Sequence, residues 1–181
     1  MSKAVLISIR PKWVEKIASG EKTIEVRKTR PNLATPFKCY IYCTLPKYPH
    51  EDFIATNYPR PQFYGGGKVI GEFTCDRIYE LETKAHGGSY YVKGEDWLTA
   101  REVAQQSCLT LKDMHDYLHA QKGYGWHITD LRIYDAPKCL FEFWAERLCR
   151  REPSVFGCGE CCDCDKRAPQ SWCYVEAMDN G

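Results

Sequence analysis

The sequence contains no hydrophobic run long enough to cross a membrane, which requires roughly 20 consecutive apolar residues. The apolar stretch at 4–9 is also too short for the core of a signal peptide, and Arg10 follows it directly. We therefore expect a cytoplasmic protein with no membrane partner. There is no internal repeat and no low-complexity tract, and the apolar fraction of 44% is typical of a folded domain rather than a disordered chain.

Two classes of nucleotide-binding protein are excluded by missing motifs. Neither GxGxxG nor GxxxxGK[ST] occurs, so the chain has no glycine-rich phosphate loop. The formal net charge of +1 also argues against binding polyanions by bulk charge. The charge is unevenly distributed, because residues 10–30 carry seven basic and three acidic side chains, a local excess of four positive charges. This segment suits a small anionic ligand or a short stretch of nucleic acid, and a solvated basic surface is the alternative.

The pattern of apolar residues predicts an α+β fold with irregularly spaced strands. The expected strands are 4–9, 22–29, 37–45, 68–81, 126–137 and a terminal edge strand at 171–176, and the expected helices are 11–19, 96–107, 110–123 and 139–148. Gly20 is expected to end the first helix and Gly123 the third. Thr110 and Asp113 have the spacing of a capping box.

Alternation with a period of two places the polar residues after Gly20 on one face of their strand. Ile24 and Val26 point to the apolar side, whereas Glu25 and Arg27 emerge together on the other. Glu25 and Arg27 can then reach the same ligand, or Glu25 can simply form salt bridges that hold the basic groups in place. The sequence favours the second of these roles for Glu25.

Cysteine is the most over-represented residue, with eleven in the chain. In a reducing cytosol these are packed thiols, metal ligands or reactive groups rather than disulfides. The tail "CGECCDCDKRAPQSWC" (158–173) is rich enough to bind structural zinc, for which we expect Cys158, Cys161, Cys164 and Cys173 as ligands in preference to Cys162. A free-thiol cluster and a redox pair are the alternatives.

The segment "ISIRPKWVEKIASGEKTIEVRKTRP" (7–31) resembles the signature of ASCH domains, whose hallmark is Gly-x-Lys-Thr-x-Glu-x-Arg. The hallmark residues are here Gly20, Lys22, Thr23, Glu25 and Arg27. "KVIGEFTCDRI" and "GYGWHITDLRIYD" are similar to later strands of these domains, and "PQSWCYVE" is similar to the tails of small bacterial and prophage members.

The resemblance implies a PUA-like mixed β-barrel of about five to seven strands with flanking helices over residues 1–149. Residues 150–181 would form a Cys-rich tail whose terminal strand packs on the barrel. The resemblance also implies a basic cleft beside the hallmark, in which RNA or a nucleotide binds. The expected ligand-binding residues are Arg10, Trp13, Lys22, Thr23, Glu25, Arg27 and Arg30, although a Trp at helical spacing is more often part of a core.

Two other functions remain open. Some relatives are amidohydrolases acting on an acylated nucleoside, and similarity to them implies catalytic roles for Lys22 and Glu72. Their candidate Thr nucleophile is replaced here by Glu25, so a hydrolase or ribonuclease would instead use Glu25 or Glu72 as base for water and Lys22 to stabilise an oxyanion. The third reading is a protein-interaction adaptor with a zinc-bound tail. We expect a monomer.

Overall fold

The structure is a computed structural model in which residues 2–56, 62–83, 89–94, 97–143 and 168–178 are described. Contacts between Cα atoms divide the chain into two units, and each unit combines stretches that are distant in sequence. Unit 1 comprises Met1–Glu15, Lys38–Phe73 and Arg132–Gly181, and unit 2 comprises Lys16–Phe37 and Thr74–Leu131. Among the described residues, no helix is long and apolar enough to span a bilayer.

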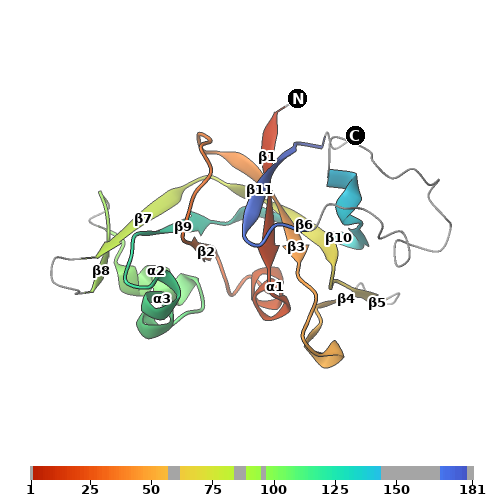
Figure 1. Ribbon diagram of the computed structural model, residues 1–181, viewed down its shortest axis with the longest axis horizontal. Helices are drawn as coiled ribbons and strands as arrows, with labels where there is room; N and C mark the ends of the chain where they lie inside the picture. The colour runs from red at the N-terminus through yellow and green to blue at the C-terminus, as the bar shows by residue number, and fades with distance from the viewer. Residues whose placement is uncertain (1, 57–61, 84–88, 95–96, 144–167, 179–181) are drawn as a thin grey trace. The chain divides into compact units, whose positions relative to one another are not determined.

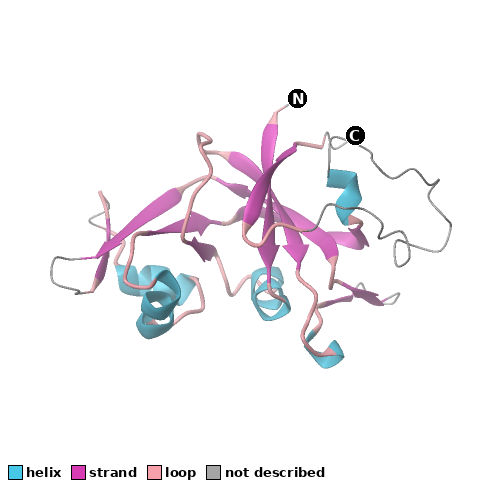
Figure 2. Cartoon of the chain, viewed as in Figure 1, coloured by secondary structure: helices cyan, strands magenta, loops and turns pink. Residues whose placement is uncertain are grey.

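Unit 1 is built on a five-stranded sheet (Figures 1 and 2). The order of its strands is β10-β6-β3-β1-β11. These strands are β1 (Lys3–Ile9), β3 (Phe37–Cys43), β6 (Lys68–Cys75), β10 (Thr129–Lys138) and β11 (Trp172–Glu176). The unit also contains the hairpin of β4 (Ile54–Thr56) and β5 (Gln62–Tyr64) and the short 3-10 helices η1 (Pro49–Glu51) and η2 (Leu140–Phe143).

The strand β1 lies between β3 and the edge strand β11 and is buried along almost its whole length. It runs parallel to β3 and antiparallel to β11, with Leu6 opposite Cys173. The strand expected at 37–45 is observed as β3. Cys39 and Cys43 are fully buried and act as small core residues, and Tyr40 and Tyr42 are buried as well, so both faces of this strand are covered. Apolar side chains from all five strands and from η2 pack into one core cluster, which includes Leu6, Tyr40 and Val175.

Unit 2 contains a four-stranded antiparallel sheet with the order β2-β9-β7-β8. Its elements are β2 (Ile24–Arg27), β7 (Ile78–Thr83), β8 (Tyr90–Val92), β9 (Gly123–His127), α2 (Ala100–Gln106) and α3 (Leu111–Leu118). The helix α1 (Pro11–Ala18) begins in unit 1 and ends in unit 2. The helices α2 and α3 pack against each other and lie on one side of the sheet (Figure 1).

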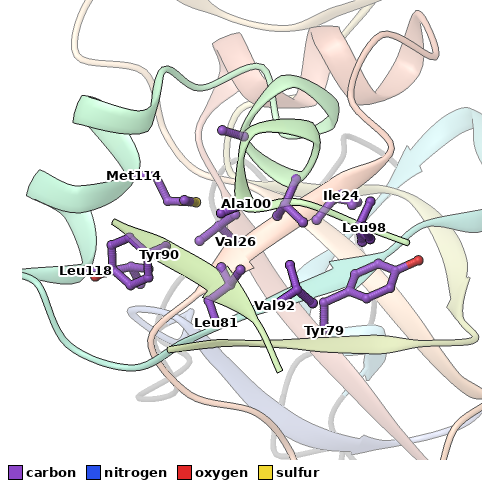
Figure 3. Close-up of a cluster of buried hydrophobic side chains, with 12 residues drawn as sticks. Ile24, Val26, Tyr79, Leu81, Tyr90, Val92, Leu98, Ala100, Met114 and Leu118 are labelled. Atoms are coloured by element: carbon purple, nitrogen blue, oxygen red, sulfur yellow. The ribbon is translucent and has the colours of Figure 1, made fainter. Parts of the chain in front are cut away.

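The core of unit 2 lies between these two helices and the sheet (Figure 3). Ile24 and Val26 of β2, Leu81 of β7, and Met114 and Leu118 of α3 are all nearly fully buried in it. The alternation predicted for β2 is therefore confirmed on its apolar side. The capping box predicted at Thr110 and Asp113 is also present, and Thr99 and Glu102 form a second one at the start of α2.

Several predicted boundaries are wrong, and each error has a physical reason. The strand expected at 68–81 is interrupted at Asp76 and Arg77, so it forms β6 and β7, which belong to different sheets. The third helix ends at Leu118 rather than at Gly123, which instead begins β9. A Cβ atom on Gly123 would lie 2.5 Å from Leu118 Cδ1, so this glycine permits a close approach instead of ending a helix.

Two further segments differ from prediction. The segment expected as one strand at 126–137 forms parts of β9 and β10, which are separated by Ile128. In the described part of the expected helix at 139–148, only the single 3-10 turn η2 is formed. The α+β class itself is confirmed.

Candidate functional site

The hallmark segment is positioned by a tight turn after α1. Gly20 has φ +78°, a left-handed conformation that favours glycine, and its N–H donates to the Ile17 carbonyl at 3.0 Å. The N–H of Lys22 then donates to the Lys16 carbonyl at 2.9 Å, and that of Thr23 to the carbonyl of Gln106 at 2.9 Å. The turn therefore fixes the chain against the end of α2, directly before β2 begins.

Three charged side chains meet at this point, and we call them the Lys22–Glu25–Arg27 cluster. Lys22 Nζ lies 3.1 Å from Glu25 Oε2, and Arg27 Nη2 lies 2.9 Å from Glu25 Oε1. Lys22 Nζ also donates to the carbonyl oxygen of Ser107 at 2.8 Å. The residues are 3%, 7% and 7% exposed, so both cations share one carboxylate in a site that excludes most solvent.

Lys22, expected among the ligand-binding residues of a basic cleft, is buried, because the carbonyl of Ser107 and the carboxylate of Glu25 hold its ammonium group inside the fold. The salt-bridging role favoured for Glu25 is confirmed. Ser107 was not among the residues predicted from the sequence. Its contribution is a backbone carbonyl at the end of α2, and no sequence signal marks such a group.

The electrostatics of Glu25 combine two opposing influences. Burial, the larger single influence, favours the neutral acid, but the charges and hydrogen bonds of Lys22 and Arg27 together hold the pKa of Glu25 below its usual range. Glu25 is therefore an ionised carboxylate at neutral pH. A water-activating base requires a raised pKa, so the structure contradicts that requirement of the hydrolase mechanism for Glu25.

The remaining hallmark and flanking residues are more accessible. Thr23 is partly buried, and its Oγ1 lies 3.5 Å from Gln106 Oε1. Arg30 is exposed, and its Nη1 lies 3.7 Å from Glu80 Oε1.

Arg10 and Trp13 belong to unit 1, where Arg10 is exposed and Trp13 is partly buried. The ammonium group of Lys12 lies 4.3 Å from the centroid of the Trp13 ring, which covers part of that ring with a cation. Trp13 is therefore not a fully buried core residue.

Glu72 also lies in unit 1, on β6. Tyr134 Oη donates to Glu72 Oε2 at 2.7 Å, and Lys38 Nζ lies 3.4 Å from Glu72 Oε1. Burial is the main cause that raises the pKa of Tyr134, and the Glu72 carboxylate raises it further. Tyr134 therefore stays protonated and donates to Glu72, which is itself only 7% exposed.

Of the four cysteines predicted to bind zinc, Cys158, Cys161 and Cys164 lie outside the described residues. Cys173 is on β11 and packs against the core of unit 1, where burial raises the pKa of its thiol to about 11. Within the described ranges, no group of three or more metal-ligating side chains is assembled.

Comparisons with known proteins identify the fold. No protein-family model matches the chain, and no curated protein is detectably similar to it in sequence. The structure is similar to that of ASCH from Zymomonas mobilis, with a TM-score of 0.56 and 17% identity over 96% of this chain and 87% of that one.

Two mutants of the same Zymomonas mobilis protein match as well. A Tyr-to-Phe mutant gives a TM-score of 0.57 with 17% identity over 97% of this chain and 91% of that one. A Ser-to-Ala mutant gives a TM-score of 0.55 with 19% identity over 96% of this chain and 88% of that one. The chain therefore has an ASCH-type fold, as the resemblance at residues 7–31 implied.

Proposed function

We propose that this protein binds RNA or a nucleotide, and that the Lys22–Glu25–Arg27 cluster recognises an anionic group of the ligand. The observation that carries the proposal is that Glu25 holds two cationic side chains within 3.1 Å of its oxygens while all three residues are less than a tenth exposed. Charges interact far more strongly in such a site than in water. The ASCH-type fold supports the same ligand class through the resemblance described above.

The three groups have separate roles in this proposal. The Arg27 guanidinium offers planar, paired N–H donors that match the geometry of a phosphate. Lys22 acts as a positioning residue, because it ties Glu25 to the end of α2 through Ser107. The cluster is almost closed to solvent. A phosphate therefore contacts Arg27 by displacing the Glu25 carboxylate from its ion pair with Arg27.

The exposed basic and aromatic residues of the hallmark region extend this proposal. Arg30 pairs with Glu80 only at 3.7 Å and is solvent-accessible, so it suits a contact to the phosphate backbone. Thr23 is proposed as a further contact of unit 2. Arg10 and Trp13, which belong to unit 1, are proposed as separate ligand contacts of that unit, Trp13 through stacking on a base.

The experiment is a titration of a fluorescein-labelled ten-nucleotide single-stranded RNA, followed by fluorescence anisotropy. Wild-type protein should bind, with affinity that falls as salt rises. Arg27→Lys keeps the charge but loses the paired donors, and it should weaken binding roughly tenfold, equivalent to about 1.4 kcal/mol. Lys112→Gln is the matched control, because it removes a cation of unit 2 whose side chain is 83% exposed.

Thermal melts of the same variants separate binding from folding. If Arg27→Lys lowers the melting temperature but the folded protein binds RNA as tightly as wild type, the cluster only stabilises the turn and the proposal is wrong. Intact RNA on a gel after the titration identifies a binding protein, whereas shortened RNA that depends on Lys22 would support the ribonuclease alternative.

A further inference from the structure

A second group of polar and aromatic residues gathers at the end of the unit 2 sheet where β7 begins and β9 ends. Asp76 and Arg77 form the connection that interrupts the strand expected at 68–81. His127 ends β9, and its N–H donates to the Arg77 carbonyl at 2.9 Å. Trp97 lies just before the N-cap of α2 and completes the group.

Trp97 is unusual because it is 60% exposed although it is the largest apolar side chain. Its ring is nevertheless held in place. It meets Tyr79 edge-on, with ring centroids 6.3 Å apart, and the Arg77 guanidinium carbon lies 5.6 Å from its centroid. A fixed, accessible indole next to an arginine is the arrangement on which bases of single-stranded nucleic acids stack.

His127 is oriented by Asp76. The distance from Nδ1 to Asp76 Oδ1 is 2.6 Å, and an ionised carboxylate can only accept, so Nδ1 carries the proton and donates. Within the described part of the chain, no hydrogen bond is made by Nε2, and the side chain is 31% exposed. The imidazole also meets the Tyr79 ring edge-on at 6.4 Å. Tyr79 therefore contacts both the histidine and the indole.

Arg77 supplies the positive charge of the group. Its side chain is exposed, and among the described residues it forms no ion pair. Asp76, the nearest acidic residue in sequence, is engaged by His127 instead. The guanidinium is therefore positioned over Trp97 with its donors directed to solvent or to a ligand.

We infer that Trp97, Arg77 and His127 form a binding site for one nucleotide of a single-stranded RNA. The base stacks on Trp97, the phosphate accepts hydrogen bonds from Arg77, and His127 Nε2 accepts a hydrogen bond from a hydroxyl group of the ligand. The choice of RNA rests on the proposed function, but none of these residues belongs to the Lys22–Glu25–Arg27 cluster.

The two sites are distinct because of strand register. Ile24 pairs with His127 and Glu25 pairs with Trp126, so Glu25 and His127 leave opposite faces of neighbouring strands. Substitutions at one site should therefore leave the side-chain contacts of the other intact.

The test uses the full chain and the ten-nucleotide RNA, with affinity measured at several salt concentrations. Trp97→Leu should weaken binding at least fivefold without changing the salt dependence, because it removes only stacking. Arg77→Gln should weaken binding and reduce the slope of log affinity against log salt by about 0.7, the value for one lost phosphate contact on a single strand. Tyr174→Leu is the matched control, since Tyr174 is an exposed aromatic residue of unit 1 with Lys3 over its ring.

Each outcome separates this site from the proposed function. If the variants at Trp97 and Arg77 bind like wild type while Arg27→Lys binds weakly, the second site is wrong and the proposed function stands. If the reverse is found, the nucleotide site stands and the role of the cluster is wrong. If wild-type protein does not bind the RNA, both are wrong. Equal losses in Tyr174→Leu and Trp97→Leu would mean nonspecific adhesion and would overturn the site.

Discussion

The strongest consequence of the buried cluster concerns stability. Glu25→Gln keeps the shape of the side chain but removes the charge that Lys22 and Arg27 share at 3.1 and 2.9 Å. Removing one partner of a buried ion pair lowers the free energy of unfolding by about 3–5 kcal/mol. The lower end of this range applies here, because the amide oxygen of the substituted glutamine still accepts a hydrogen bond. For a chain of this length, about 3 kcal/mol lowers the melting temperature by roughly 6–12 °C.

The assay is thermal unfolding followed by circular dichroism at a series of pH values. Because the pKa of Glu25 is lowered in the folded protein, its ionised form contributes stability above the unfolded-state pKa, near the ordinary value of 4.5. That contribution is lost as the pH falls through the folded-state pKa. The difference in melting temperature between wild type and Glu25→Gln should therefore have its full size at pH 7 and shrink progressively below about pH 4.5.

Glu21→Gln is the matched control, because Glu21 pairs with Lys16 at 2.8 Å in the same turn but has a side chain that is 59% exposed. Exposed ion pairs add little, so its melting temperature should stay within about 2 °C of wild type. The reasoning is refuted if Glu25→Gln melts like this control at pH 7. It is also refuted if the loss in Glu25→Gln is the same at pH 7 and pH 3.

Three further predictions test other parts of the account. Gly71→Ala should destabilise the protein by about 1–3 kcal/mol in chemical denaturation, because the new Cβ would lie 2.5 Å from the backbone carbonyl oxygen of Arg132 in β10. An unchanged denaturation midpoint would show that β6 and β10 leave room for this Cβ. Tyr134→Phe should cost about 1–3 kcal/mol in the same assay, since Glu72 loses a buried donor at 2.7 Å, and a neutral effect would contradict that role. We propose that the tail binds zinc, so elemental analysis should find about one zinc per chain that is lost in a Cys158→Ser, Cys161→Ser double variant; a fully stable, metal-free wild type would end this proposal.

Much of the fold could be predicted because local signals agreed with the tertiary structure. The capping box at Thr110 and the turn at Gly20 depend on backbone groups only a few residues away. Alternation identified the apolar face of β2, because Ile24 and Val26 pack into the core of unit 2. These features required no knowledge of distant contacts.

The rest depends on contacts that are distant in sequence. Lys22 was expected to contact a ligand, but it is buried and donates to the carbonyl of Ser107, which is 85 positions away. The interruption of the strand at Asp76 and Arg77 carries no proline or glycine, and it reflects the passage of the chain from one sheet to another. The candidate charges of the hallmark could be found from the sequence, whereas their burial and pairing could not.

The central claim is that the Lys22–Glu25–Arg27 cluster recognises an anionic group of RNA or a nucleotide. A crystal structure of the full chain with the ten-nucleotide RNA tests it most directly. The account predicts a phosphate oxygen within hydrogen-bond distance of the Arg27 guanidinium, with the Glu25–Arg27 pair lengthened from its present 2.9 Å. RNA bound elsewhere, with all three side chains in their present contacts, would contradict it.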